Sequence, residues 1–515
     1  MVKLHEYQGK QILAKYGISL PQSILATSPN EARQFAEKIG AVVVKAQVWT
    51  TSRAAQNLIH FAATSDEAAQ AANTLIGQRV GNFIVEHVLV EEQVAIEQEW
   101  YLGLIIDDQA RVPVLLFSAV GGSGIEEILT ANPNQVIRHQ INIREGLQDF
   151  EAREICRRAG IGGRTMLKLS QVIRRFYDAT RYYEARSAEI NPLVLTKDGQ
   201  IMALDARFTI DDYALFRHPD LDIEVARELD RPPTKLEKIA WQVEKDDYRG
   251  TFYFIQMMSD FEKGQNVVGF HGAGGGGSMM NMDALLARGF QIANFVDTSG
   301  NPPASKVYRA ARIILSQANI DGYYAGGSGV ASQEQFHSAR GLVKAFMDTQ
   351  LNIPAVIRIG GNAEEEAIDI LQRAKGTFPA PLEAYGRDDS PDMCAERLQA
   401  LIETYEPLQD PPVRENPQAQ DPYQFETVTG GTVTFDHALC RNCESKICIE
   451  TCVPQILSLD EGVPVLNIGH DEAKRGACTE CLACEVECYF LGNRGGIIHL
   501  PIQGLSSEKN HADID

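Results

Sequence analysis

Short runs of β-branched and aromatic residues alternate with longer segments of helical period between Val42 and about Asp205. Five of these runs predict strands, and they read AVVVKAQV, NFIVEHVLVE, YLGLIID, VPVLLFSAV and IMALDARF. Before the last run, the segments EAREICRRAGI and LSQVIRRFYDATRYYE repeat apolar residues at helical spacing, so they predict helices. This pattern predicts an α+β nucleotide-binding domain, which we place at residues 1–240.

A second region, placed at residues 241–405, repeats the order strand, glycine turn and helix. Its four predicted strands read NVVGFHG, QIANFVD, DGYYAGG and PAVIRIGG. The repetition predicts a flavodoxin-like, doubly wound parallel sheet with its ligand edge at the glycine turns. One turn, HGAGGGGSMMNMD, contains Gly272 and Gly274 and opens a helix, a geometry that presents backbone N–H groups to an anion.

After residue 405 the composition changes. The stretch YEPLQDPPVRENPQAQDPY is rich in Pro, Gln and Asp and has no period, so residues 406–429 are predicted to be an extended linker. Eight of the ten cysteines lie beyond it, between Cys440 and Cys488, with only Cys156 and Cys394 elsewhere. Such a concentration is typical of site ligands in a reducing compartment rather than of distributed crosslinks.

The clustered cysteines form two groups, Cys-x2-Cys-x4-Cys-x3-Cys and Cys-x2-Cys-x2-Cys-x3-Cys. The second is the bacterial ferredoxin run, in which three close thiolates hold one cluster and the fourth ligates the other. This wiring predicts two [4Fe-4S] clusters with the ligand sets Cys440, Cys443, Cys448, Cys488 and Cys452, Cys478, Cys481, Cys484.

Two structural zinc sites and a disulfide knot are the alternatives, although zinc usually takes two close pairs. Two features depart from the ferredoxin pattern: four residues precede Cys448, and Tyr489 stands where a proline is usual. We place a small ferredoxin-like iron–sulfur domain at residues 430–505 and a tail at 506–515, which makes the whole chain an α/β and α+β multidomain protein.

Charge narrows the classes of partner. Lys and Arg number 48 against 69 for Asp and Glu, a net charge of −21 at pH 7, and no basic stripe interrupts this excess. Nucleic acid and anionic membranes are therefore not expected as partners. No window supplies the roughly 18 apolar residues that a spanning helix needs, and the sequence is interpreted as cytoplasmic.

Three segments of the first 400 residues, HEYQGKQILAKYGI, AEINPLVLTKDGQIMALDAR and ALFRHPDL, together resemble the β subunit of succinyl-CoA synthetase. That protein belongs to the ATP-grasp group of NDP-forming acyl-CoA synthetases. The resemblance implies an ATP-grasp domain that binds ATP or GTP with Mg²⁺. It also implies that Lys45 and Arg53 contact phosphate and that Glu91 and Glu99 contact the nucleotide.

Asn191 and Asp205 fall at the ends of two predicted antiparallel strands. Amide and carboxylate oxygens of this kind suit octahedral Mg²⁺ bound to phosphates. An exposed acid or a strand-end lysine is, by itself, more often merely solvated. Taken together and in the order of the family, these residues favour a nucleotide site.

The phosphate loop departs from the family pattern. Where the family has a glycine-rich loop ending in Gly-Gly-Arg-Gly-Lys, this chain has Thr51, Ser52, Arg53, Ala54 and Ala55. Glycines let backbone N–H groups approach phosphates closely, and lysine supplies charge. Their loss predicts weaker nucleotide binding or another use of the loop, with the two hydroxyls as substitute donors.

The resemblance further implies that the glycine turns face a phosphohistidine on a partner, with Gly329, Val330 and Ala331 flanking it as the catalytic segment. An α-type CoA-binding subunit is expected to supply that histidine, with a small carboxylate and CoA bound nearby. The second strand's loop reads TSGNPP instead of a glycine triplet, which predicts an acyl group other than succinate. His271 is an alternative acceptor in this chain, although a strand-end histidine is more often structural.

These features predict the β-like subunit of an NDP-forming acyl-CoA synthetase, an acid–thiol ligase that converts carboxylate, CoA and NTP into acyl-CoA, NDP and phosphate. Its ferredoxin module would exchange electrons with a redox partner protein. The alternative is a catalytically silent ATP-grasp scaffold serving as the electron-transfer subunit of an oxidoreductase complex. The altered loop favours the scaffold, whereas the retained polar residues favour the ligase, namely Lys45, Glu99, Asn191 and Asp205.

Overall fold

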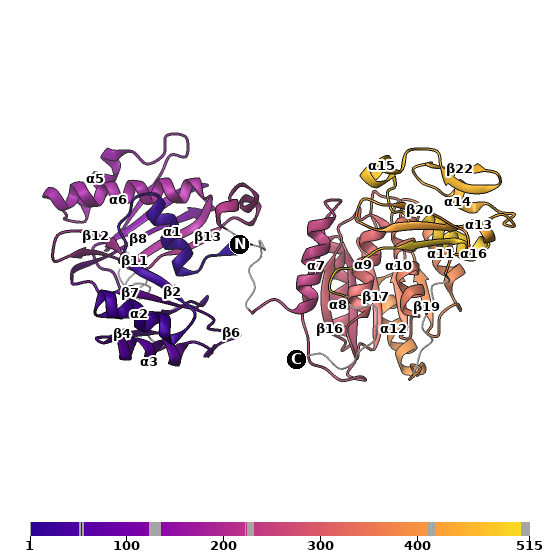
Figure 1. Cartoon of the computed structure of the whole chain (residues 1–515), viewed down its shortest axis with the longest axis horizontal. Helices are drawn as coiled ribbons and strands as arrows, with labels where there is room; N and C mark the ends of the chain where they lie inside the picture. The colour runs from indigo at the N-terminus through magenta and orange to yellow at the C-terminus, as the bar shows by residue number, and fades with distance from the viewer. Residues whose placement is uncertain are drawn as a thin grey trace. The chain divides into compact units, whose positions relative to one another are not determined.

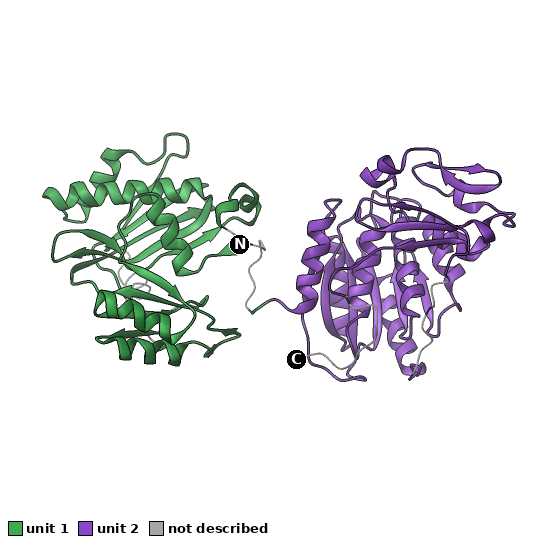
Figure 2. Cartoon of the chain, in the orientation of Figure 1, with its two compact units in different colours: residues 1–232 green, residues 233–515 purple. Residues whose placement is uncertain are grey.

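The structure, a computed structural model, describes residues 2–50, 53, 56–122, 135–221, 223, 231–409, 414 and 418–505. The chain forms two compact units, Met1–Pro232 and Pro233–Asp515 (Figures 1 and 2). Among the described helices, none has both the length and the apolar character of a membrane span.

The larger sheet of the first unit has seven strands in the order β1-β13-β11-β8-β9-β10, with β12 paired to β11. The strands are β1 (Val2–Lys3), β8 (Ile96–Asp107), β9 (Val112–Ser118), β10 (Val136–Gln140), β11 (Ala185–Thr196), β12 (Ile201–Ala203) and β13 (Arg207–Ile210). Helices α1 (Glu6–Lys15), α5 (Asp149–Arg158) and α6 (Gly163–Tyr182) contribute to its core. On α6 the buried residues Leu169, Ile173 and Phe176 recur at helical spacing, which forms the face that packs on the sheet.

The smaller sheet of this unit is antiparallel, in the order β2-β7-β3-β4. Its strands are β2 (Ser23–Ala26), β3 (Val42–Ala46), β4 (Ile59–Ala62) and β7 (Val88–Glu92), and helices α2 (Pro29–Ile39) and α3 (Ser65–Leu75) share its core. The run NFIVEHVLVE was predicted as one strand but forms two. Its first part is β6 (Phe83–Ile84), which pairs with β5 (Arg79–Val80), whereas β7 joins the larger ladder. The run IMALDARF likewise divides into β12 and β13.

The second unit contains a six-stranded sheet in the order β14-β16-β15-β17-β18-β19. All four predicted strands are present, as β15 (Val267–Ala273), β16 (Gln291–Asp297), β17 (Gly322–Gly327) and β18 (Ala355–Arg358). With β19 (Leu382–Tyr385) they are parallel, in the flavodoxin-like order. The antiparallel edge strand β14 (Tyr253–Gln256) and the other edge strand, β19, were missed because each is a run of only four residues that includes a polar one.

Helices cover both faces of this sheet. On one face, the sheet forms an apolar core with α8 (Gly275–Ala287) and α12 (Pro391–Thr404). The other lies with α7 (Lys235–Asp246), α9 (Ala304–Leu315), α10 (Phe336–Thr349) and α11 (Glu364–Ala374). This is the doubly wound arrangement that the sequence predicted.

The cysteine-rich region lies in the second unit, over helices of the flavodoxin-like domain (Figure 1). It has two small sheets, β20 (Pro422–Glu426), β21 (Thr432–Asp436) and β24 (Gly496–His499), and β22 (Leu457–Asp460) with β23 (Val463–Leu466). Its helices are α13 (His437–Cys440), α14 (Ile447–Glu450), α15 (His470–Glu472) and α16 (Ala483–Leu491). Phe435, Val486 and Ile498 join the core of α9 and α10, so the two parts share one apolar interior. The boundary predicted at 240 falls inside α7, and β20, which pairs with β21, lies within the predicted linker 406–429. The boundary at 405 stays a prediction.

Candidate nucleotide, anion and cysteine sites

Six charged side chains meet in the first unit, and we call them the charge cluster. They are Glu6, Lys10, Lys45, Arg53, Glu91 and Asp205. Glu6 and Lys10 lie on helix α1, Lys45 on β3 and Glu91 on β7, whereas Arg53 and Asp205 lie in segments between strands. Lys45 pairs with Leu89 in the ladder of β3 and β7. Glu91 is therefore its diagonal neighbour on the same face of the sheet.

Every cation of the charge cluster contacts a carboxylate. Lys45 Nζ lies 2.9 Å from Glu6 Oε1 and 2.5 Å from Glu91 Oε2. Arg53 bridges Glu6 Oε2 at 2.6 Å and Asp205 Oδ2 at 2.7 Å. Lys10 Nζ is 2.9 Å from Glu6 and also pairs with Glu91. Three acids and three bases make the charge cluster neutral when all six are ionised.

Electrostatics keeps these buried groups charged. Burial opposes the charged form of Lys45, but Glu6, Glu91 and Asp205 outweigh it and raise the lysine pKa above its ordinary value. Burial likewise opposes ionisation of Glu6, yet Arg53, Lys10 and Lys45 hold its pKa well below the ordinary value. Sequence reasoning missed Glu6 and Lys10, although they stand four residues apart in HEYQGK, which is the spacing of a helical ion pair.

The residues predicted to bind Mg²⁺ lie opposite each other. The register that pairs Glu189 with Arg207 and Leu193 with Ala203 sets Asn191 opposite Asp205. Asn191 lies inside β11, where its register with β8 shifts, rather than at a strand end as predicted. Asp205 lies between β12 and β13.

The amide oxygen of Asn191 and both carboxylate oxygens of Asp205 already accept hydrogen bonds. Gly122 N–H donates to Asn191 Oδ1 at 2.8 Å, and Arg53 and the Ala206 N–H donate to Asp205 at 2.7 Å. The ligand types fit Mg²⁺, and the ion would share Asp205 with Arg53. Glu99 lies beside Gly122, and within the described residues no ion pair joins it to the charge cluster. Of the altered loop only Arg53 is described; 51, 52, 54 and 55 lie outside the described residues.

A pocket lies at the glycine turns of the second unit, and we call it the glycine-edge pocket. Gly329 and Ala331 line it, whereas Val330 is 79% exposed and does not. Gly329 adopts φ +76° beside Arg387, and Gly274 caps α8 with φ 81°, conformations that favour glycine. Gly272 precedes that cap within β15.

His271 also lines the glycine-edge pocket. Its Nδ1 lies 2.6 Å from the Tyr323 hydroxyl, and burial lowers its pKa to about 3, so the ring is neutral. Arg358, at the same pocket, donates to the carbonyls of Asp389, Gly327 and Arg387. Sequence reasoning did not single out Arg358, because a lone arginine at the end of a strand carries no specific signal.

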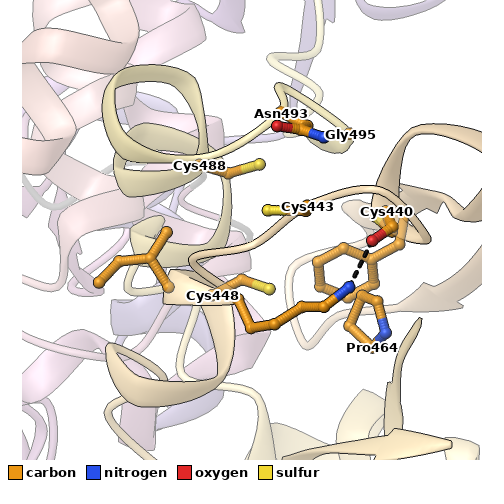
Figure 3. A pocket seen from close by; sticks show the side chains of 10 residues that line it. Cys440, Cys443, Cys448, Pro464, Cys488, Asn493 and Gly495 are labelled. Carbon is orange, nitrogen blue, oxygen red and sulfur yellow. Dashed lines mark hydrogen bonds between the residues drawn. The ribbon is translucent and has the colours of Figure 1, made fainter. Parts of the chain in front are cut away.

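Four cysteines line a second pocket, and they are Cys440, Cys443, Cys448 and Cys488. Figure 3 shows the sulfur atoms of Cys443, Cys448 and Cys488 turned toward a common space. Three of these residues come from the first spacing group and the fourth from the second. A Cβ added at Gly495 would lie 2.9 Å from Cys440 Sγ, so the backbone approaches the sulfur closely.

The chemistry of this pocket suits a cationic group. Burial, followed by the neighbouring thiols of Cys488 and Cys443, raises the pKa of Cys440 to about 12. Burial and thiols likewise raise the pKa of Cys448 to about 12. Around Cys443 burial is outweighed by the Ser445 hydroxyl and by backbone N–H donors, which lower its pKa. Burial therefore favours the neutral thiols of Cys440 and Cys448, and a bound metal centre would supply the positive charge that their thiolates need.

The other four clustered cysteines interact with one another. Burial, then Cys481, Cys478 and Cys452, raises the pKa of Cys484 well above its ordinary value. All ten cysteines are free thiols. Across the described residues no three His, Cys, Asp or Glu side chains surround the position of a single ion.

Two family models match the chain. The ATP-grasp domain model matches residues 3–195, and the ATP citrate lyase citrate-binding model matches residues 262–399. The cysteine-rich region lies beyond both.

Curated relatives cover most of the chain. The β subunit of GDP-forming succinate–CoA ligase from Thermus thermophilus is 36% identical over 385 residues, which is 74% of this chain and 97% of that protein. The β subunit of the ADP-forming enzyme from Roseiflexus sp. is 35% identical over 72% of this chain and 93% of its own length. ATP citrate lyase from Methanothrix soehngenii, solved with citrate and coenzyme A, superposes with a TM-score of 0.65 at 18% identity, covering 77% of this chain and 99% of that one. At that identity the superposition shows a shared fold alone.

Proposed function

This chain belongs to the family of succinate–CoA ligase β subunits, a family of acid–thiol ligases, and from that membership we propose that it is the β-like subunit of an NDP-forming acyl-CoA synthetase that also carries two [4Fe-4S] clusters. The proposed reaction joins a small carboxylate to CoA at the expense of ATP or GTP. An α-type subunit supplies the phosphorylated histidine and binds CoA. A redox partner protein exchanges electrons with the clusters.

The observation that carries the iron–sulfur part is the grouping of cysteines around one pocket. Cys440, Cys443 and Cys448 come from one spacing group, and Cys488 lies about forty residues later, yet all four line the same space. Three ligands from one run and one from the other is the ferredoxin arrangement. Bound clusters would supply one-electron chemistry at low potential.

For the ligase part, each group of residues has a proposed task. Lys45 and Arg53 hold phosphate oxygens, Glu91 and Glu99 orient the nucleotide, and Mg²⁺ is bound by Asn191 and Asp205. At the glycine-edge pocket, the segment 329–331 flanks the partner's histidine, and the backbone N–H groups near Gly272 and Gly274 face an anion. The citrate-binding match of residues 262–399 and the TSGNPP loop both support a carboxylate other than succinate.

The charge cluster supports the alternative of a silent scaffold. Its three cations are fully paired, so none of these three offers a spare positive charge to a triphosphate. A nucleotide gains these contacts only by displacing internal carboxylates, which is costly for buried pairs. In this alternative the chain keeps the ATP-grasp fold and contributes only electron transfer.

Two measurements test the proposal on the anaerobically purified chain with its α-type partner. Iron and sulfide analysis with electron paramagnetic resonance after reduction is expected to give about eight iron atoms per chain. About two zinc atoms without a reducible signal would remove the iron–sulfur assignment. Calorimetry with MgATP and MgGTP separates the ligase from the scaffold, because only the ligase binds nucleotide.

A further inference from the structure

Three glutamates stand among the ligands of the second cysteine group, and all three are buried. They are Glu480, Glu485 and Glu487, each at most 2% exposed. The segment 478–488 thus places a carboxylate beside nearly every cysteine of the run. Buried carboxylates need charged partners, and here the partners belong to the flavodoxin-like domain.

Helix α10 supplies two of these partners. Arg340 Nε lies 3.0 Å from Glu487, and Lys344 Nζ lies 2.9 Å from Glu485. Both cations are only 2% exposed. Arg414 adds a second contact to Glu485, at 3.0 Å. The outer helices of a doubly wound sheet ordinarily show such cations to water, whereas here the cysteine-rich region covers them.

The opposite face of α10 lines the glycine-edge pocket. Ser338 and Leu342 lie at the pocket wall, as does Gln335 at the N-cap. At about 100° per residue, Leu342 and Lys344 point roughly 200° apart around the helix axis. One helix therefore has one face at the pocket and the other at the cysteine motif.

Helix α9 likewise has one face at the glycine-edge pocket and another at the cysteine motif. Val307 lines the glycine-edge pocket. Two residues later, Arg309 donates to Thr429 at 2.6 Å and lies 4.0 Å from Glu480. Lys306 is fully buried and donates to the Asp247 and Arg249 carbonyls, which holds the loop whose Arg249 side chain contacts Glu480 at 2.7 Å.

We propose that α9 and α10 link the ligand occupancy of the glycine-edge pocket to the oxidation state of the cluster held by Cys452, Cys478, Cys481 and Cys484. The inference rests on the proposed function, because it needs that cluster. Reduction adds one electron, taken from a low-potential donor, to a site whose neighbouring carboxylates are balanced by cations of α9 and α10. The added negative charge shifts that balance and, through the two packed helices, the pocket wall on their far side.

Linkage makes the effect reciprocal. A ligand that binds the reduced protein more tightly raises the midpoint potential by the same free energy. For a one-electron couple a tenfold difference in affinity corresponds to about 59 mV, so the two quantities can be compared directly. We expect a factor of about five or more, which is about 40 mV. Lys344 acts here as a positioning residue, since it reaches the cluster only through Glu485.

The test uses the full chain with its clusters, oxidised and then reduced with dithionite. Hydrogen exchange of residues 336–349 is expected to differ between the two states without any ligand. The probe ligand is inorganic phosphate, whose affinity is measured in both states and whose effect on the midpoint potential is read by electron paramagnetic resonance.

A paired variant, Lys344→Gln with Glu485→Gln, removes both charges and keeps the acceptor for the Ile498 N–H. It is expected to abolish the redox dependence of exchange in α10. The matched control, Arg288→Gln with Asp392→Asn, removes a pair at 3.1 Å between α8 and the first turn of α12, and it should leave that dependence intact.

The outcomes separate the two proposals. Absence of iron in the wild type ends the proposed clusters and this inference with them. Iron present, with exchange in α10 equal in both states, overturns the inference and leaves the clusters in place. Redox dependence that persists in the paired variant also overturns it. If the paired variant does not fold, the wild-type comparison decides alone.

Discussion

Glu6→Gln is the sharpest perturbation of the charge cluster. The Glu6 carboxylate contacts Lys10 and Lys45 at 2.9 Å and Arg53 at 2.6 Å, with 2% of its side chain exposed. Glutamine keeps the size and the polar atoms, so no cavity forms and only the charge is lost. The charge cluster then holds three cations and two carboxylates.

The cost follows from the partners that are left. Removing one member of a buried ion pair typically costs about 3–5 kcal/mol. Lys45 keeps Glu91 at 2.5 Å and Arg53 keeps Asp205 at 2.7 Å, so we expect a cost below that range, about 2–3 kcal/mol. For a unit of this size the melting temperature should fall by roughly 4–12 °C.

Nucleotide affinity, by contrast, should rise in the Glu6→Gln variant. The uncompensated cation offers a charge-assisted hydrogen bond to phosphate, a gain of about 1.5–3 kcal/mol, or roughly tenfold to a hundredfold in affinity. Scanning calorimetry gives the stability and titration with MgATP gives the affinity. Glu37→Gln, an exposed residue of α2, is the matched control and should change neither. Lower stability with unchanged affinity would refute the idea that internal pairing limits nucleotide binding.

Three further substitutions test the sites separately. Gly495→Ala brings a methyl group to 2.9 Å from Cys440 Sγ, so iron content should fall from about eight atoms to about four, whereas Gly469→Ala, with open space around its Cβ, should leave it unchanged. Asp205→Ala should abolish Mg²⁺-dependent nucleotide binding and spare the iron, as measured by calorimetry and iron analysis. Gly329→Ala strains a φ of +76° against Arg387, so acyl-CoA formation with the partner subunit should drop at least tenfold while the melting temperature falls by only a few degrees.

Local patterns in the sequence determined most of the elements. Strand, glycine turn and helix recur four times in the second unit, and period alone located those strands because parallel strands buried on both faces are continuous apolar runs. The cysteine spacing grouped Cys488 with Cys440, since in that wiring the fourth thiolate of one run joins the other group. The edge strand β14 was not predicted, because an edge strand does not need a continuous apolar run.

Only the tertiary structure decided what the charged residues do. Glu6 and Lys10 stand at the spacing of a helical ion pair, but the pairing of Glu6 with Lys45 exists only where α1 meets the smaller sheet. By its position in the helical pattern Lys344 would lie on a solvent-exposed face. It is buried because the cysteine-rich region packs over α10. The periods of helices and strands can be read from neighbouring residues in the sequence. The ion pair between Lys344 and Glu485 instead depends on how two distant segments pack, and no local pattern predicts it.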